Sequence, residues 1–255
     1  TTALTRAGET PTTYEYAAGD YLQVGNIDLS GHPNWIPIGN TYSNNFKGTY
    51  HVATDGSDYY TINGLTIYDE ESTSSLGLFG YFEYNDAEIA NINMTNVSIY
   101  APNATAAAVV GSAASEEIYY CNVLSGTINA KIAAGIAGNA SNLKIENCTN
   151  AATITGSNYA SGITTYAGFP VKYCVNTGDI TAQGDAAGIS TGANKADYCS
   201  NSGDVSSTNN TAGGILGSPY SVDATIYGCY NTGNITAGRY AGGIIGSCYN
   251  NIDIK

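Results

Sequence analysis

The chain has 255 residues and a formal net charge of −13, because only eight Lys and Arg residues stand against 21 Asp and Glu residues. So few cations argue against binding to nucleic acid or to an anionic membrane surface, since both need clustered positive charge. No segment approaches the roughly 20 consecutive apolar residues of a membrane span, so no membrane insertion is expected. The 31 Gly and 22 Tyr residues describe a turn-rich chain, a composition typical of secreted or cell-surface proteins.

The negative charge is concentrated in the first half of the chain. Residues 1–120 contain 14 acidic residues and two basic ones, Arg6 and Lys47, whereas residues 121–255 contain seven acidic and six basic residues. The first 20 residues are Thr-rich and lack periodicity, which predicts a flexible leader over residues 1–20. Short strand-like runs follow at 21–24 and 27–29, and we interpret residues 21–60 as N-terminal capping strands.

One motif then recurs along the rest of the chain. It is clearest as Cys-Val-Asn-Thr-Gly-Asp-Ile-Thr at residues 174–181 and as Cys-Tyr-Asn-Thr-Gly-Asn-Ile-Thr at residues 229–236. Each copy closes on a Gly-Ile pair, and these pairs begin at Gly135, Gly162, Gly188, Gly214 and Gly243. Steps of 26 to 29 residues between the pairs indicate stacked structural repeats.

The spacing within one repeat predicts an all-β fold. Each unit has three short apolar pieces separated by Gly, Asn and Ser, and none has helical spacing. Three short strands in a turn of about 26 residues match a single-stranded parallel β-helix, or β-solenoid. We therefore predict a right-handed parallel β-helix of about seven coils over residues 21–255, with the repeat coils at 61–255. A β-sandwich, the main alternative, would not require identical residues at a constant long period.

Stacking of the coils places like residues in files along the axis. One inward file is expected to contain Ile128, Ile154, Ile180, Val205 and Ile235. A second file contains Cys121, Cys148, Cys174, Cys199 and Cys229, which we interpret as buried small side chains rather than a metal site, because ligands in a line do not form a tetrahedron. A third file, expected at a corner and bonded amide to amide, contains Asn150, Asn176, Asn201 and Asn231.

Several segments resemble bacterial cell-surface proteins with GLUG-type repeats. The early ones lie at residues 27–30, 35–39, 46–48, 62–67 and 77–80, and the later Asn-x-Gly-x-Ile and Ala-Gly-Gly-Ile-x-Gly units look like the repeats themselves. The resemblance covers about residues 20–246. It implies a right-handed parallel β-helix on an exported, extracellular or cell-surface protein, with any signal or anchor segment outside this sequence. Such modules occur in adhesins and beside secreted peptidases, so the resemblance says little about activity.

Catalysis is not expected from the residues present. The best carboxylate pair is Asp179 and Asp204, about one coil apart, but each follows a turn Gly where Asp is a common structural residue. The same pair is a weak Ca²⁺ candidate without the clustered oxygens of a dedicated loop. His32 and His51 have no expected catalytic partner, and no nucleotide, zinc or nucleophile motif appears. We predict no enzyme activity, no metal and no cofactor.

Surface chemistry is the remaining signal. Tyr120, Tyr173 and Tyr198 each precede a Cys of the repeat, so an inward Cys would direct these rings outward; Tyr227 and Tyr230 flank Cys229 and extend the set. An outward tyrosine file suits stacking on sugar rings or packing on protein, although Tyr is also simply a good strand residue. A parallel file of hydroxyl side chains contains Thr155, Thr181, Ser206 and Thr236.

The sequence therefore favours a non-catalytic, adhesin-like surface module that binds a host or cell-surface glycan or protein. One alternative is an accessory or remnant part of an exported carbohydrate-active enzyme or peptidase. Another is a structural spacer that displays a second domain. The open ends of a β-helix also make end-to-end or edge-to-edge oligomers possible partners.

Overall fold

The computed structural model describes residues 18–32, 34–83, 87–114, 117–219, 223–248 and 251–255. Most of the expected leader, residues 1–17, lies outside these ranges, and Asp20, the last residue of that leader, already begins the first strand. Every regular element of the described chain longer than one residue is a β-strand. Within those ranges there is accordingly no helix of the length and apolarity needed to cross a membrane.

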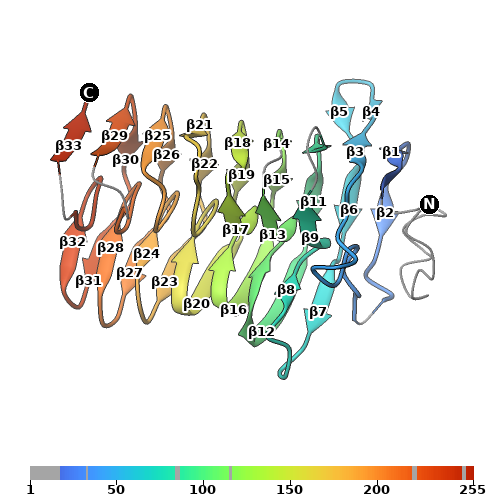
Figure 1. Cartoon of the computed structure of the whole chain (residues 1–255), viewed down its shortest axis with the longest axis horizontal. Coiled ribbons are helices and arrows are strands. Elements are labelled where there is room, and N and C mark those ends of the chain that lie inside the picture. Colours follow the sequence, from blue (N-terminus) through green and yellow to red (C-terminus); the bar gives the residue numbers. More distant parts are fainter. Residues whose placement is uncertain (1–17, 33, 84–86, 115–116, 220–222, 249–250) are drawn as a thin grey trace.

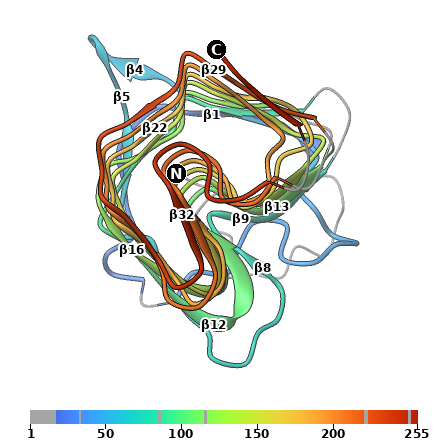
Figure 2. The ribbon, with the colours of Figure 1, turned by 90° about the vertical axis from the view of Figure 1, so that its left-hand side faces the viewer.

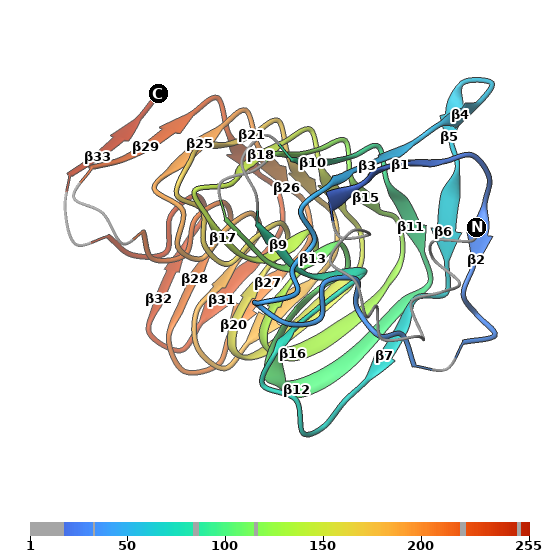
Figure 3. The same cartoon turned by 45° about the vertical axis from the view of Figure 1, so that its right-hand side comes forward.

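The strands form a right-handed parallel β-helix, as the repeat spacing predicts. All strand pairs are parallel except the hairpin of β4 (Thr54–Asp55) and β5 (Asp58–Tyr59), which projects from the side of the solenoid in Figure 2 and Figure 3. Figure 1 shows the coils stacked from the N-terminal end to the C-terminal end of one long body. Seen from the C-terminal end, the chain runs counterclockwise as it approaches the viewer (Figure 2).

Two sheets carry the first half of each coil. The first sheet, in stacking order, contains β1 (Asp20–Gln23), β3 (Thr49–Val52), β10 (Glu88–Ala90), β14 (Glu117–Tyr119), β18 (Lys144–Glu146), β21 (Val171–Lys172), β25 (Lys195–Asp197), β29 (Asp223–Tyr227) and β33 (Asn251–Ile254). The second contains β2 (Ile27–Asp28), β6 (Thr61–Asn63), β11 (Asn93–Thr95), β15 (Asn122–Val123), β19 (Thr149–Asn150), β22 (Val175–Asn176), β26 (Ser200–Asn201) and β30 (Tyr230–Asn231).

The third sheet runs out to a sharp bend and back. Its outgoing strands are β7 (Thr66–Tyr68), β12 (Val97–Ala107), β16 (Gly126–Ala134), β20 (Thr153–Ser161), β23 (Ile180–Ala182), β27 (Val205–Ser207) and β31 (Ile235–Ala237). The returning strands are β8 (Ser75–Leu76), β24 (Ala186–Ala187), β28 (Thr211–Gly213) and β32 (Tyr240–Gly242). A fourth, inner sheet contains β9 (Phe79–Glu83), β13 (Val110–Ala114) and β17 (Ala137–Ser141). In cross-section the returning segments curl into the interior (Figure 2).

This path corrects the expectation of three strands per coil. The Ile-x-x-Cys piece is not one strand: Ile118 lies in β14 of the first sheet, whereas Cys121 lies at the corner before β15 of the second. The Gly-Ile piece belongs to the inner curl, and the return from the bend adds a further direction. Each coil therefore has an additional segment that folds back inside it, unlike a coil built from three strands.

The stack has about eight coils, one more than expected. The difference lies at the N-terminus, where residues 21–60 do more than cap the stack. Tyr21 pairs in register with Tyr50, and Ile27 pairs with Ile62, so β1 and β2 already form a coil with the same path as later ones.

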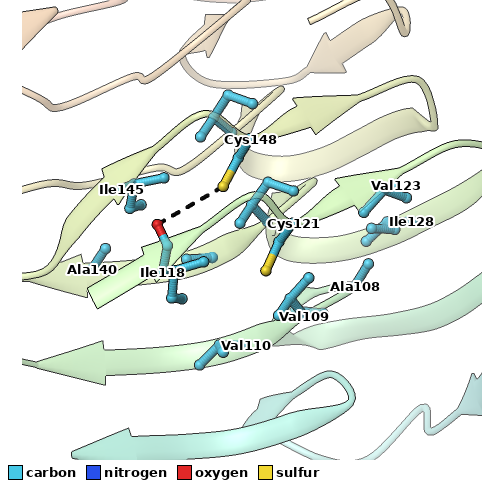
Figure 4. Close-up of a cluster of buried hydrophobic side chains, with 14 of the residues drawn as sticks. Ala108, Val109, Val110, Ile118, Cys121, Val123, Ile128, Ala140, Ile145 and Cys148 are labelled. Carbon is cyan, nitrogen blue, oxygen red and sulfur yellow. Dashed lines mark hydrogen bonds between the residues drawn. The ribbon is translucent and has the colours of Figure 1, made fainter. Parts of the chain in front are cut away.

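The interior is apolar and continuous, in agreement with the predicted inward files. Ile128, Ile154 and Ile180 are register partners in successive coils, and the file continues through Val205 to Ile235. The early coils are filled by rings instead: Phe46 lies between Phe79 and Phe82, with ring centroids 4.8 and 5.9 Å away. Figure 4 shows a part of the later interior, where Cys121 and Cys148 pack among Ile, Val and Ala side chains.

Candidate functional site

The corner between the first and second sheets has a left-handed backbone conformation in six successive coils. The residues at this corner and their φ angles are Asn91 (66°), Tyr120 (54°), Asn147 (55°), Tyr173 (53°), Tyr198 (53°) and Gly228 (62°). Asn and Gly adopt this conformation readily, whereas for a bulky L-residue it costs about 1–2 kcal/mol. Three coils thus place a tyrosine where the backbone disfavours one. We call Tyr120, Tyr173 and Tyr198 the corner tyrosines.

The Cys file closes the corner from the inside. Each thiol donates to the carbonyl two residues earlier: Cys148 Sγ lies 3.3 Å from Glu146 O, and Cys174 Sγ lies 3.2 Å from Lys172 O. Each also reaches the preceding coil, as in the 3.9 Å contact from Cys148 Sγ to Ile118 O in Figure 4. The same carbonyls also accept a backbone N–H from the corner of the preceding coil, as Glu146 O does from Tyr120 N at 3.2 Å and Lys172 O from Asn147 N at 3.0 Å, so the thiols add a second contact from the inside.

The cysteines themselves are reduced and mostly inaccessible. Cys121, Cys148, Cys174 and Cys199 are free and buried, Cys229 is half-buried, and Cys248 is exposed. Burial raises the pKa of the Cys148 and Cys174 thiols, which keeps them protonated and poor as nucleophiles or metal ligands. The file therefore has the structural position that the sequence predicts.

The rings of the corner tyrosines face solvent. Tyr120, Tyr173 and Tyr198 are 48, 49 and 48% exposed. Tyr173 and Tyr198 stack in parallel, with ring centroids 5.3 Å apart and an interplanar angle of 4°. Tyr120 instead packs edge-on against Tyr119, with centroids 5.8 Å apart. The rings point outward as expected, but the cause is the left-handed corner and not the alternation of a strand.

The five predicted tyrosines do not form one file. Asn147 occupies the coil between Tyr120 and Tyr173, so the file is interrupted there. Tyr227 lies at the end of β29, in register with Asp197, and reaches the file from the side: its ring meets that of Tyr198 edge-on at 5.0 Å. Tyr230 is exposed but lies on β30 in the second sheet, beyond the corner.

Gly228 ends the file for a steric reason. A Cβ at this position would lie 2.7 Å from Cδ1 of Tyr198, so the ring of Tyr198 occupies the space that a side chain would need. The hydrogen bond between Tyr198 and Tyr227 raises the pKa of Tyr198. Tyr173, Tyr198 and Tyr227 thus form one aromatic cluster at the C-terminal end of the corner.

Charged pairs line the strands of the first sheet that precede the corner. Lys144 contacts Glu117, and Lys172 Nζ lies 3.7 Å from Glu146 Oε1, each pair joining neighbouring coils. Exposed pairs of this kind contribute little to stability, so they mainly give the sheet a mixed-charge surface.

The Asp179 and Asp204 pair has a structural role in this fold. Asp179 Oδ1 accepts the backbone N–H of Asp204 at 3.0 Å, and Asp204 Oδ1 accepts that of Asn234 at 2.9 Å. Each carboxylate thus ties its turn to the next coil. Over the described ranges, no group of three or more His, Cys, Asp or Glu residues is arranged to hold a metal ion.

The Asn file bonds as predicted, at the corner where the strands of the second sheet end, and its side chains point into the core. Asn150, Asn176 and Asn201 are fully buried, and each amide donates to the Oδ1 of the next Asn at 2.7–2.8 Å. Each also donates to a turn carbonyl two residues later, as from Asn176 Nδ2 to Gly178 O at 2.8 Å. The ladder ends at Asn231, which is partly exposed in the last coil.

Two side-chain clusters were missed from the sequence. His51 Nε2 faces Glu88 Oε1, and Tyr119 Oη donates to Glu88 Oε2 at 2.9 Å, so His51 has the partner that the sequence did not reveal. Burial, with this hydrogen bond, raises the pKa of Tyr119 to about 12. The second cluster is a stacked pair, Tyr68 and Tyr100, on the third sheet. Each follows an inward Ile as Thr155 does, so extending the Thr file to earlier coils would have located it.

No protein-family model matches this sequence, and no curated protein or solved structure is significantly similar to it. The parallel β-helix therefore rests on the register of its strands.

Proposed function

We propose that this chain is a non-catalytic, adhesin-like binding module of an exported or cell-surface GLUG-type protein, and that the corner tyrosines contact a glycan. The observation that carries the proposal is the left-handed conformation of Tyr120, Tyr173 and Tyr198. Asn91, Asn147 and Gly228 occupy the same corner without that strain. Strain that an available residue type would relieve is a sign of function when the side chain is exposed.

The geometry supports a sugar as the ligand. Parallel stacking covers one face of Tyr173 with Tyr198, so its other face points toward the coil of Asn147, whose side chain is much shorter. A ring face beside an amide and flanked by exposed hydroxyl groups can offer a sugar both stacking and hydrogen bonds. The ion pairs on the adjoining strands add polar groups at the rim.

The supported role is binding and not turnover. The best carboxylate pair, Asp179 and Asp204, accepts backbone hydrogen bonds from the next coil, and the Cys thiols are buried. The accessory-region alternative shares this binding role and differs only in what the module is attached to. The spacer alternative differs in predicting no ligand.

A glycan array followed by titration calorimetry tests the proposal. The informative variants are Tyr173→Asn and Tyr198→Asn, because Asn147 shows that this corner accepts Asn, and Asn147→Tyr, which fills the gap beside Tyr173. We expect each to weaken the best glycan by about tenfold, in line with the loss of one stacking contact and its hydrogen bonds. Tyr240→Thr is the matched control, since Thr211 is its register partner one coil earlier.

Two outcomes contradict the proposal. One is a complete absence of glycan binding, which favours the spacer. The other is a bound glycan whose affinity is unchanged in all three corner variants, which places its site elsewhere.

Stability provides an independent readout of the same idea. Tyr120→Asn removes about 1–2 kcal/mol of backbone strain and loses about 0.5–1 kcal/mol of edge-on contact with Tyr119. We expect the free energy of unfolding in urea to rise by roughly 0.5–1 kcal/mol. A destabilised Tyr120→Asn variant would show that the ring of Tyr120 stabilises the fold, and the strained conformation would then no longer indicate a binding role.

A further inference from the structure

A second aromatic surface lies on the other side of the coil, at the N-terminal edge of the third sheet. Tyr68 and Tyr100 are register partners in β7 and β12, and their rings stack with centroids 5.3 Å apart and an interplanar angle of 20°. They are 57 and 38% exposed. β7 is the outermost strand of this sheet, and along its outer edge the backbone N–H of Tyr68 donates to Asn34 Oδ1 at 3.0 Å, which leaves the ring of Tyr68 exposed.

A short acidic loop follows Tyr68 and is fixed against it. Tyr68 Oη donates to Glu70 Oε1 at 2.5 Å, and Asn103 Nδ2 donates to the Glu70 carbonyl at 2.7 Å. Asp69 turns the loop by accepting the backbone N–H of Ser72 at 2.8 Å. Glu70 and Glu71 are both exposed, and the Glu70 carboxylate is the one that contacts Tyr68. We call Tyr68, Tyr100, Glu70 and Glu71 the acidic tyrosine patch.

The later coils show that the fold does not need these rings. The same outward file continues as Asn129, Thr155, Thr181, Ser206 and Thr236, all smaller and uncharged. Exposed stacked tyrosines with the Glu70 carboxylate against them, followed by Glu71, are therefore a local addition to a surface that otherwise has small polar residues.

The charge around the patch selects the ligand. Lys47 is the only Lys or Arg between residues 7 and 130, so this half of the solenoid has a strongly negative potential. An aromatic ring face and a carboxylate together attract an ammonium or guanidinium group, the first through the ring quadrupole and the second through charge. An acidic polysaccharide would be repelled, whereas a cation gains charge attraction to the carboxylates in addition to contact with the ring.

We propose that the acidic tyrosine patch docks a Lys- or Arg-rich segment of a partner protein, with one cationic side chain over Tyr68 and its charge against Glu70 and Glu71. This surface is separate from the corner tyrosines, so it does not depend on the glycan proposal. It gives the module a second class of ligand, in the half of the chain where the charge is concentrated.

The test uses the whole chain and fluorescent oligo-arginine and oligo-lysine peptides, with an oligo-glutamine peptide as the neutral probe. The main variant is Tyr68→Thr/Tyr100→Thr, since Thr already occupies this file at 155 and 181. The second is Glu70→Gln/Glu71→Gln, in which the side-chain amide oxygen introduced at position 70 can still accept from Tyr68. Fluorescence anisotropy at low and at physiological salt measures the affinities.

We expect the cationic peptides to bind and the neutral peptide not to bind. The Thr variant should bind the cationic peptides about tenfold more weakly. The Gln variant should bind several-fold more weakly and should depend less on salt. Tyr173→Asn, at the corner, should leave peptide binding unchanged. If the wild type and the Thr variant bound the cationic peptides with equal affinity, the binding would be diffuse charge attraction without a role for the rings, and the proposal would be overturned. Failure of the cationic peptides to bind, or equal binding of the neutral peptide, would overturn it as well.

Discussion

The early and late coils occupy the same inward-facing position with different residues, apolar in the early coils and Asn in the late coils. On the second sheet, the file reads, in register from N to C, Ile27, Ile62, Met94, Val123, Asn150, Asn176, Asn201 and Asn231. The first four positions are apolar, and the last four form a hydrogen-bonded ladder of amides that is buried down to Asn201. The strand path does not change at the switch.

The glycines of the Gly-Ile pairs are tied to this ladder. A Cβ on Gly162 would lie 2.4 Å from Cγ of Asn176 and 2.1 Å from the Gly188 carbonyl oxygen, and Gly135 and Gly188 meet Asn150 and Asn201 in the same way. Where the file is still apolar, at Val123, the preceding coil has Ala108 in place of this Gly. The Ala–Val pair of the earlier coil is therefore replaced as a unit by a Gly–Asn pair in the later coils, and the shape of the coil is kept.

The two kinds of file differ in how strictly they fix the alignment of neighbouring coils. A buried apolar file gains free energy wherever its side chains fill space, so it tolerates loops of different length. A buried amide ladder is favourable only when every donor and acceptor is met, so it penalises any slip between coils. In agreement with this difference, the step from the repeat Cys to the next inward Ile or Val is six residues in all four coils of the ladder and seven in the coil of Cys121.

Gly162→Ala should give the largest effect. The new methyl group has backbone oxygen on one side and an amide of the ladder on the other, and neither is the free end of a flexible chain. We expect a loss of at least about 3 kcal/mol in the free energy of unfolding, measured by urea denaturation. Ala108→Gly, the matched change in an apolar coil, should cost only about 1 kcal/mol. Similar losses in both variants would mean that the two regions do not differ as described.

Asn176→Val should have the next largest effect. It leaves Asn150 Nδ2, Asn201 Oδ1 and the Gly178 carbonyl with fewer partners inside the core. We expect a loss of about 2–4 kcal/mol by the same denaturation measurement. The volume-conserving control in the apolar part of the file, Met94→Leu, should cost less than about 1.5 kcal/mol. A neutral Asn176→Val variant would show that the ladder is replaceable filling.

The smallest effect concerns pH. Burial raises the pKa of Asp185, a residue of the late coils whose carboxyl group accepts a hydrogen bond from Asn210 Nδ2 at 2.6 Å. The equivalent position one coil earlier is occupied by Tyr159. A raised pKa means that the folded state holds the proton more tightly than the unfolded chain, so this group's contribution to stability is lost as pH rises.

The wild-type free energy of unfolding should therefore fall relative to that of Asp185→Asn as pH increases from about 4 to 7. Urea denaturation of both proteins at several pH values measures the difference, in which the other carboxyl groups cancel. A difference that stays constant across this range would exclude a shifted Asp185.

The limits of the sequence are visible at the corners. The Cys and Ile files followed from periodicity, because stacking repeats a residue type at each level. The conformation at Tyr120, Tyr173 and Tyr198 did not, because a left-handed residue is normally marked by Gly or Asn and these three are neither. The sequence placed the Asn ladder at a corner but did not decide its burial: Asn is a common turn residue, and only the hydrogen-bond partners around it make a core position favourable.

The sequence alone determined the period, the parallel stacking and the identity of most inward files, since a fixed repeat leaves one simple way to bury its apolar residues. The tertiary structure decided what lies beside what across coils. The stacking of Tyr68 on Tyr100, the enclosure of Asn176 by Gly162 and the contact of His51 with Glu88 each join residues from different coils. Such contacts depend on the detailed path of the chain around the coil, which the spacing of a repeat does not specify.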